Sequence, residues 1–357
     1  MDPFEFVANP ARVVFGSGTI AQVPAELARL DARRVLVLTT PQQQVQGQAI
    51  LDMLGQVGAG IFSDATMHTP VDVTERALKI VKELRADCVV AIGGGSTTGL
   101  GKAIALRTDL PQLVIPTTYA GSEMTTILGE TNAGRKTTIR DLKVLPETVI
   151  YDVDLTLGLP PVMSGTSGIN AIAHAVEALY ADNGNPVLAQ LAEQGIRHLA
   201  RSLPTIARTP TDIEARTDAL YGAWLCAICL GTAGVALHHK ICHTLGGSFD
   251  LPHAETHTIV LPHAVGYNAP AIPDAMAALR RALDSDSPAD ALFDLAADIA
   301  APLGLAEIGM ATADVTRAVD ILLENRFFNP RSLDRARLEV LLADAVAGRR
   351  PRTDSLS

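Results

Sequence analysis

The first half of the chain alternates short apolar runs with stretches of helical spacing. The runs are short enough for strands that are buried on both faces of a sheet, and they are Arg34–Thr40, Gly60–Ser63, Asp87–Ile92 and Leu113–Pro116. The stretches between and after them are Ala49–Val57, Val71–Leu84 and Thr97–Arg107. Strands separated by helices of this length predict βαβ units and a mostly parallel sheet.

The pattern changes after residue 123. Glu123–Ile127 and Lys136–Ile139 flank the turn residues Thr131–Gly134, which predicts a hairpin. Turn residues between Tyr151 and Pro161 predict a domain boundary. The helical segments expected beyond it are Gly165–Tyr180, Pro186–Ser202, Asp212–Leu230, Ala233–Gly246, Pro273–Leu283, Asp290–Ala300, Ala313–Leu323 and Leu333–Ala347. We therefore expect a Rossmann-like parallel-sheet domain over residues 1–160 and an all-helical domain over residues 161–357.

Composition narrows the class of protein. At 357 residues, with 48% hydrophobic and 19% charged positions, the chain suits two well-buried domains. The net charge of −10, without a run of Lys or Arg, argues against nucleic-acid binding. The acidic start lacks the apolar core of a signal peptide, and no apolar stretch approaches the ~20 residues of a membrane span. A cytoplasmic protein without membrane or nucleic-acid partners is the expectation.

A glycine-rich loop follows the third predicted strand. Gly93, Gly94, Gly95 and Ser96 lie between this strand and a helix, an arrangement that cradles phosphate because the backbone can approach closely and the helix offers free N–H groups. A second polar loop, with Thr117, Thr118 and Ser122, follows the next strand. Both loops open at the carboxyl edge of the sheet, where dinucleotides bind. A tight turn without a ligand remains the alternative interpretation of the glycines.

Thr40 ends the strand that begins near Val35. An acidic residue at this place would bind an adenosine ribose and repel the extra phosphate of NADPH. Because Thr40 is neutral, we expect use of NADH or NADPH.

Histidines are concentrated in one segment of the second half. Six of the nine lie between His238 and His263, and His239/His243 and His253/His257 are two pairs with the spacing of one helix face. Asn170 and His174 are four residues apart in an upstream helical segment. Converging histidines ordinarily indicate a metal site, but Asn170 is an amide where a charged ligand would be expected.

The motifs resemble the iron-containing (group III) alcohol dehydrogenase family. The resemblance rests on GGGS after a strand, PTTYAGSEMT, the N-A-x-x-H helix, and H-x-x-x-H-x-L-G-G followed by P-H. It covers essentially the whole chain and implies the architecture that this family shares with dehydroquinate synthase. The stretches GGGSTTGLGKAIALRT, IPTTYAGSEMTTILGE and LKVLPETVIYDVDLTLGLP resemble the branch that reduces maleylacetate to 3-oxoadipate in the degradation of aromatic compounds.

The resemblance also assigns residues. An Asp and three His ligate iron or zinc in the family, and the matching positions are Asn170, His174, His239 and His253, while His243 matches a histidine near the nicotinamide. Gly99 stands where the family usually carries Asp. An amide lowers metal affinity because it offers a neutral oxygen instead of an anion. We therefore expect no metal, with His243 as proton donor and His239, His253 and His174 binding substrate oxygens.

The substrate implied by the resemblance is a small dicarboxylate. Lys240 and Arg326, together with Asn170, are the expected substrate-binding residues, although surface charge is an equal interpretation of both cations. A homodimer is common in the family and is expected here. Three alternatives remain open: a metal-dependent alcohol dehydrogenase for another small alcohol or aldehyde, a nucleotide-binding sensor, and a dehydroquinate-synthase-like lyase.

Overall fold

The computed structural model describes Phe4, Phe6, Asn9 and residues 12–132 and 134–352. The chain forms two compact units, one that ends at Leu159 and one that runs from Pro160 onward.

The first unit is built on a six-stranded sheet in which all the neighbouring strands are parallel, in the order β1-β8-β5-β4-β2-β3. The strands are β1 (Arg12–Gly16), β2 (Val35–Leu38), β3 (Gly58–Phe62), β4 (Cys88–Gly93), β5 (Gln112–Pro116) and β8 (Thr148–Asp152). All residues of β2, β4, β5 and β8 are buried. This burial on both faces explains why these strands are apolar runs without alternation.

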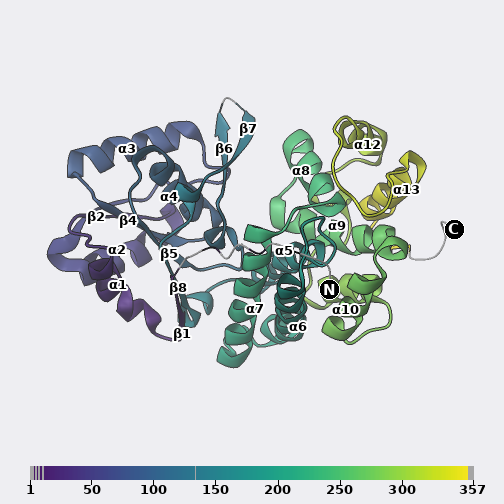
Figure 1. Ribbon diagram of the computed structural model, residues 1–357, viewed down its shortest axis with the longest axis horizontal. Coiled ribbons are helices and arrows are strands. Elements are labelled where there is room, and N and C mark those ends of the chain that lie inside the picture. The colour runs from purple at the N-terminus through teal and green to yellow at the C-terminus, as the bar shows by residue number, and fades with distance from the viewer. Residues whose placement is uncertain (1–3, 5, 7–8, 10–11, 133, 353–357) are drawn as a thin grey trace. The chain divides into compact units, whose positions relative to one another are not determined.

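Helices cover both faces of this sheet (Figure 1). Side chains of α1 (Val23–Arg29) and α2 (Gln44–Leu54) pack into one apolar cluster with one set of alternate strand residues. Side chains of α3 (Val71–Leu84) and α4 (Gly95–Thr108) pack with the other set. The predicted Rossmann-like sheet is confirmed, with the carboxyl ends of β2, β4 and β5 side by side at one edge.

The hairpin lies four residues later at its start than predicted. It consists of β6 (Ile127–Asn132) and β7 (Arg135–Arg140), paired in antiparallel register. Glu123 and Met124, predicted as the start of a strand, belong instead to a short 3₁₀ turn over Ser122–Met124. Gly121 has a φ of 85°, in the left-handed region, which ends the preceding loop and starts this turn.

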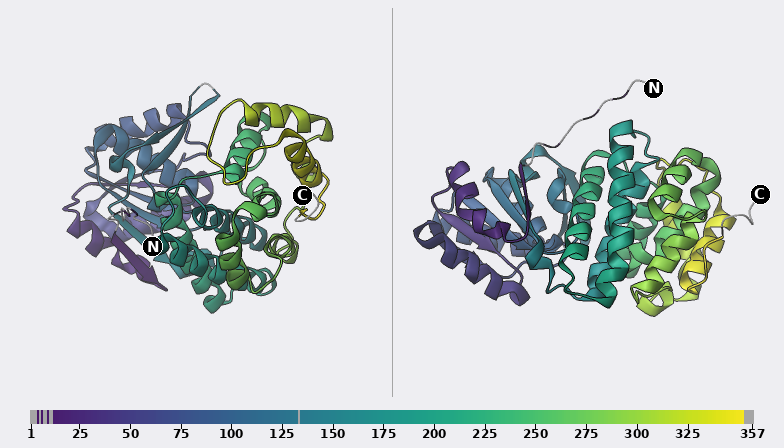
Figure 2. Two further views of the ribbon diagram at one scale, coloured as in Figure 1. Left: turned by 45° about the vertical axis from the view of Figure 1, so that its right-hand side comes forward. Right: turned by 90° about the horizontal axis from the view of Figure 1, so that it is seen from below.

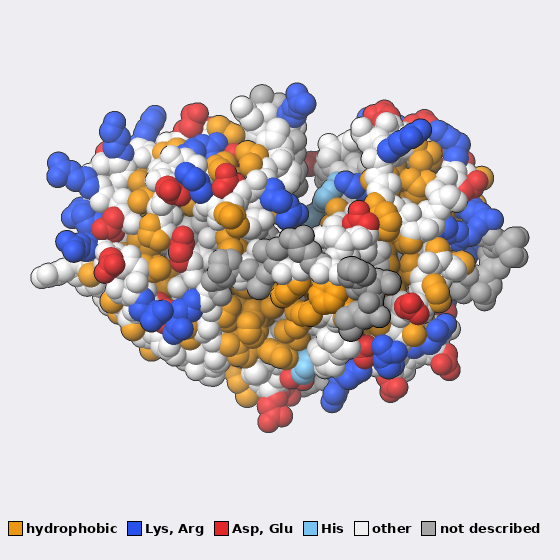
Figure 3. Space-filling model, viewed as in Figure 1, with side chains coloured by type: hydrophobic (Ala, Val, Ile, Leu, Met, Phe, Trp, Pro, Cys, Tyr) orange, Lys and Arg blue, Asp and Glu red, His pale blue; other side chains and the backbone are white. Residues whose placement is uncertain are grey.

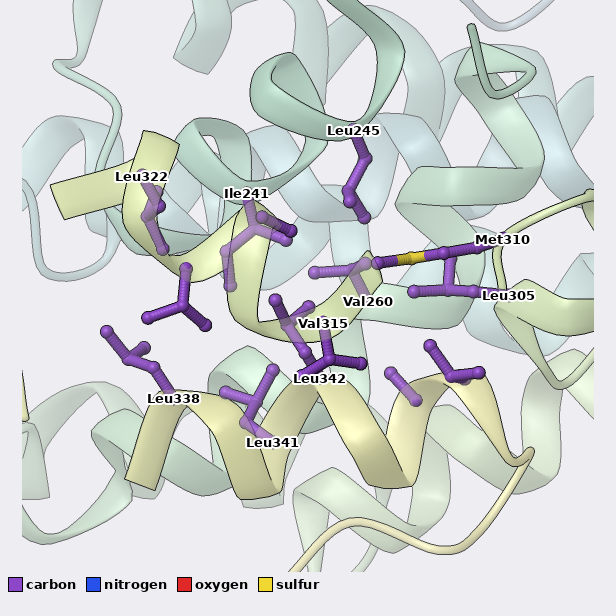
Figure 4. Close-up of a cluster of buried hydrophobic side chains, with 14 of the residues drawn as sticks. Ile241, Leu245, Val260, Leu305, Met310, Val315, Leu322, Leu338, Leu341 and Leu342 are labelled. Atoms are coloured by element: carbon purple, nitrogen blue, oxygen red, sulfur yellow. The ribbon is translucent and has the colours of Figure 1, made fainter. Parts of the chain in front are cut away.

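The second unit is helical, as predicted. Its helices are α5 (Pro161–Ala178), α6 (Pro186–Arg208), α7 (Ile213–Thr232), α8 (Leu237–Phe249), α9 (His253–Asn268), α10 (Pro273–Leu283), α11 (Pro288–Asp298), α12 (Val315–Leu323) and α13 (Arg335–Val346). Both views in Figure 2 show them packed against one another in the teal-to-yellow part of the chain. Buried side chains of α8, α9, α12 and α13 meet in one apolar cluster that includes Ile241, Leu245, Val260 and Leu342 (Figure 4). This packing holds α8 in place, the helix that carries His239 and His243.

Two strands, β1 and β8, and two helices, α1 and α9, were not predicted from the pattern. β8 begins before the predicted domain boundary and extends into its first two residues, Tyr151 and Asp152, and β1 pairs with it along its whole length. α9 was missed because it is buried on all sides and contains Pro262, so it has neither an apolar stripe nor uninterrupted helical sequence.

Among the described residues, no single helix is long and apolar enough to cross a membrane. Only α7 and α8 taken together meet that criterion, and they are bent by 90° at the break between them. Lys and Arg are interspersed with Asp and Glu on the face shown in Figure 3.

Candidate active site

The glycine loop lies at the carboxyl end of β4 and leads directly into α4. Gly93 has a φ of 144°, and a Cβ there would lie 2.5 Å from Gln43 Oε1 and 2.8 Å from Thr97 Oγ1. A side chain at residue 93 is therefore excluded twice, by backbone conformation and by space. No side chain caps the start of α4 within the described structure. The N–H groups of its first turn are therefore available to a phosphate.

The second polar loop is held against the first. The backbone N–H of Thr117 donates to the Gly93 carbonyl at 2.9 Å. Gln43 Nε2 donates to Thr117 Oγ1 at 3.0 Å, and Thr40 Oγ1 donates to Gln43 Oε1 at 3.3 Å. The polar ends of β2, β4 and β5 thus form one continuous patch. Gln43 was not singled out from the sequence, because nothing local marks it as the link between two distant loops.

Lys102 serves the second loop rather than the phosphate cradle. Its Nζ is fully buried and donates to the carbonyl oxygens of Ser122, Thr125 and Ile127 at 2.6–2.9 Å, and to the Thr125 hydroxyl at 2.8 Å. Burial lowers the pKa of Lys102 to about 7. Lys102 therefore neither points toward the glycine loop nor lies on the exposed side of α4. Ser122 is correspondingly anchored through its carbonyl.

Gly99 packs closely against Thr69. A Cβ at this position would lie 2.3 Å from Thr69 Oγ1, and Thr69 is itself in the left-handed region at a φ of 45°. Thr69 therefore occupies the space that a side chain at residue 99 would need.

The histidine cluster is assembled from three helices of the second unit. Asn170 and His174 lie on α5, His239 and His243 on α8, and His253 and His257 on α9. The ring of His174 stacks on that of His239 with centroids 5.1 Å apart, and the ring of His257 lies 5.0 Å from His239 and 4.3 Å from His253. His243 lies 6.0 Å from His239. The structure thus brings together the four histidines that the sequence singled out.

The histidines of the cluster differ in how deeply they are buried. His174 and His239 are buried, whereas His243 and His253 are exposed. Burial lowers the pKa of His174 well below its usual range, and the neighbouring His239, His253 and His243 lower it further. His174 is therefore a neutral imidazole, the form that binds a metal ion.

Glu177 is the residue that sequence reasoning missed. It is buried one turn after His174, and its carboxylate accepts hydrogen bonds from the backbone N–H groups of Ala236 at 2.7 Å and His238 at 2.8 Å. It also lies 2.7 Å from His239 Nδ1. Because a carboxylate only accepts, Nδ1 carries a proton, and in the neutral imidazole the lone pair is therefore on Nε2. An acidic residue one turn from a candidate ligand, in the same apolar helix, was the signal available in the sequence.

A second group of buried residues lies behind the first. His238 Nε2 is 2.9 Å from His257 Nδ1 and 3.8 Å from Cys242 Sγ, and all three residues offer ligand-type atoms within 4.8 Å of one another. Burial lowers the pKa values of His238 and His257 and raises that of Cys242. His238 and His257, to which no role was assigned from the sequence, are thus part of the buried cluster.

The donors in the first group fit a divalent metal ion. Asn170 Oδ1, His174 Nδ1 and His239 Nε2 are buried and have no hydrogen-bond partner among the described residues. A carbonyl oxygen and neutral imidazole nitrogens are ligands that iron and zinc accept. Leaving such atoms buried and unpaired costs about 1–3 kcal/mol each, which a bound ion would remove. Asn170, His174 and His239, with His253 beside them, are the residues that could hold it.

Lys240 and Arg326 line one pocket of the second unit. The pocket has a volume of about 400 Å³ and is also lined by His243 and Thr244 of α8. Asn170, the third residue expected to bind substrate, lies instead with the buried donors of the metal site.

Family comparisons agree with this geometry. A sequence model described as "Iron-containing alcohol dehydrogenase" matches residues 10–153, and one described as "Fe-containing alcohol dehydrogenase family, C-terminal" matches residues 164–346. The predicted family and architecture are confirmed.

Individual relatives are similar over almost their whole length. A maleylacetate reductase of Rhizobium sp. (strain MTP-10005) is 51% identical over 98% of this chain and 100% of the relative. One from Sphingobium indicum is 53% identical over 98% and 99%. The crystal structure of maleylacetate reductase from Agrobacterium tumefaciens has a TM-score of 0.96 at 51% identity, covering 98% of this chain and 100% of that one. An iron-containing alcohol dehydrogenase from Corynebacterium glutamicum has a TM-score of 0.93 at 41% identity, covering 99% and 98%.

The expectation that no metal is needed is wrong. Both family models describe iron-containing proteins, and the buried donors form a set that suits such an ion. The prediction rested on the missing charge of Asn170 alone. The sequence does not show that its side-chain oxygen and the neighbouring imidazole nitrogens are buried without hydrogen-bond partners.

We predict that Glu177→Gln weakens metal binding. The carboxylate accepts from His239 Nδ1 and two backbone N–H groups, whereas an amide has a single acceptor oxygen, so Gln leaves at least one of these donors unpaired and no longer places a negative charge behind the His239 ring. Loss of an outer partner of a metal-bound histidine typically costs about 10–100-fold in affinity. Anaerobic titration with Fe²⁺, followed by calorimetry, measures it. Glu193→Gln, which alters a carboxylate paired with Arg281 on the surface, is the control, and equal affinities in both variants would contradict the role of Glu177.

Proposed function

Because the chain belongs to the iron-containing alcohol dehydrogenase family, we propose that it is an NAD(P)H-dependent reductase of the carbon–carbon double bond of maleylacetate, giving 3-oxoadipate. The observation that carries this proposal is identity above one half, over nearly the full length, to maleylacetate reductases of separate organisms. The residues of the site add chemical support.

We propose that the unit ending at Leu159 binds the dinucleotide and that the helical unit binds the substrate. The cofactor-binding residues of this proposal are those at the ends of β2, β4 and β5, namely Thr40, Gly93, Gly94, Gly95, Ser96, Thr117, Thr118 and Ser122. When bound, the nicotinamide supplies a hydride and the metal ion a Lewis acid. The neutral end of β2 supports use of both NADH and NADPH.

Asn170, His174, His239 and His253 are proposed as the metal ligands rather than as hydrogen-bond donors to substrate. The lone pair on His239 Nε2 supports this choice, because a nitrogen without a proton cannot donate. An amide with three neutral imidazoles leaves a divalent ion at +2, whereas a carboxylate would leave +1. The larger residual charge favours an anionic substrate over a neutral alcohol on Coulomb grounds.

The substrate's double bond is conjugated to its ketone. Hydride arriving at the carbon far from the ketone moves the electron pair of the double bond toward the ketone oxygen, and the carbon beside the ketone then takes a proton. His243 is the proposed proton donor because it is exposed beside the buried histidines and close to His239. Lys240 and Arg326 are the proposed cationic contacts of the substrate. A cytoplasmic location is part of the proposal and is supported by four buried, free cysteines in the described chain. A homodimer is proposed as well.

A second candidate is a metal-dependent alcohol dehydrogenase for another small alcohol or aldehyde. The likeness to the Corynebacterium glutamicum structure favours it. The two functions differ in substrate, so one assay separates them.

We expect purified, metal-loaded protein to consume NADH with maleylacetate and to form 3-oxoadipate. Removal of the metal by a chelator should abolish the reaction, and Fe²⁺ or Zn²⁺ should restore it. Loss of NADH absorbance and chromatography of the product measure the outcome. Turnover of a simple aldehyde with none of maleylacetate would instead establish the second candidate.

We expect Gly95→Ala to weaken NADH binding by about tenfold or more without unfolding the protein. A Cβ at Gly95 meets no atom within 4 Å, so the fold has room for it, but it would project where a phosphate approaches the first turn of α4. Fluorescence titration with NADH and thermal unfolding test both parts. Gly158→Ala is the matched control, because Gly158 is equally open but lies outside the loops. Unchanged NADH affinity in Gly95→Ala would place the phosphates elsewhere.

His243→Ala should lower kcat by about 10²–10⁴-fold, the usual contribution of a general acid, and leave NADH affinity nearly unchanged. His198→Ala, a histidine paired with Asp218 on the surface, is the control. If only cofactor affinity falls in His243→Ala, the proton-donor role is wrong.

A further inference from the structure

The pocket beside His243 has the lining of an anion site. Its polar side chains are Lys240, His243, Thr244, Ser248, Asn325 and Arg326. None of the residues that line it is Asp or Glu. A space of about 400 Å³ with two cations and several hydrogen-bond donors suits a small organic anion.

The two cations are not neutralised by the protein. Across the part of the chain that the structure describes, neither Lys240 nor Arg326 forms an ion pair, and Lys240 Nζ lies 5.9 Å from the ring of Phe327. The other large pocket, near β3, differs in this respect, since its Arg76 is already paired with Asp64. Two cations facing one space repel each other until an anion binds between them.

The walls of the pocket are held in place. On one side, Ile241 and Leu245 of α8 are anchored in the apolar cluster of Figure 4. On the other side, Asn329 lies three residues after Arg326 in the chain. Its side chain exchanges hydrogen bonds of 2.8 and 3.0 Å with that of Asn268 in α9. The Asn329 side chain also accepts from the backbone N–H of Leu237, the first residue of α8, at 3.4 Å. The segment that carries Arg326 is thus tied to the helix that carries Lys240.

The pocket and the histidine cluster share His243. His243 lines the pocket, and the ring of His243 lies 6.0 Å from that of the buried His239. A dicarboxylate whose reacting part lies at the histidines can therefore place one end in the pocket.

We propose that this pocket is a carboxylate subsite, in which Lys240 and Arg326 bind one end of a dicarboxylate and so select diacids over monoacids. The inference rests on the proposed function, because it names the part of that site which recognises the second charge of the substrate. Phe327 and Leu322 line the same space and offer apolar contact to the carbon chain of the ligand.

The test is direct binding of an unreactive diacid. Adipate has the chain length of maleylacetate without its double bond or ketone, and hexanoate is the same chain with a single carboxylate. We expect metal-loaded protein to bind adipate more tightly than hexanoate, measured by calorimetry. Arg326→Gln and Lys240→Gln should each weaken adipate binding by about tenfold, leaving hexanoate unchanged. Arg317→Gln, an exposed arginine over Phe249 and outside the pocket, should change neither.

Kinetics supply the second readout. In the two pocket variants the KM for maleylacetate should rise by a similar factor, while kcat and the KM for NADH stay within a few-fold. Equal adipate affinity in wild type, Arg326→Gln and Lys240→Gln would overturn the subsite even if maleylacetate is reduced. Adipate binding that depends on both cations, in a protein that does not reduce maleylacetate, would support the subsite and reject only the proposed reaction.

Discussion

One buried carboxylate determines the geometry of the histidine site. Glu177 joins α5 to the first turn of α8 through two backbone N–H groups and orients His239 through Nδ1. Burying the Glu177 carboxylate without these donors would cost several kcal/mol of folding free energy. Separating the two helices or turning the imidazole away is therefore unfavourable. The position of His239 relative to His174, and the tautomer that faces it, both follow from this contact.

Burial then determines the chemical state of the other donors. His174, His238 and His257 are kept neutral because a charged imidazole would lose its hydration inside the apolar helical unit. Neutral imidazoles and the Asn170 amide carry no charge, so they present lone pairs without compensating a cation. The exposed members, His243 and His253, are the ones in contact with solvent. The cluster thus has buried, neutral imidazoles on one side and solvent-accessible imidazoles on the other.

The edge of the sheet that carries the glycine loop also depends on both local and distant contacts. Gly93 is required by its own backbone conformation and by the space that Gln43 and Thr97 leave. The link from Thr40 through Gln43 to Thr117 joins three strands that are far apart along the chain. Lys102, which follows the glycines in sequence, turns inward to hold the Ser122–Ile127 segment. Its role depends on acceptors that only folding brings to it.

The sequence alone determined the βαβ alternation, the helical second half, the phosphate-type loop and the family, because these are properties of local period and motif order. Val71–Leu84 begins and ends where its pattern predicts, since its apolar stripe faces one side of the sheet. α9 was missed because it has no apolar stripe and because Pro262 interrupts its helical sequence.

The tertiary structure decided which histidines are buried, which are exposed, and which atoms remain unpaired. It also decided that Glu177 orients His239 and that Lys240 and Arg326 share one pocket. Spacing along a helix defines a shared face, but the environment of that face comes from helices elsewhere in the chain. That environment sets protonation, tautomer and the fit to a metal ion, which is why the metal could not be judged from Asn170 alone.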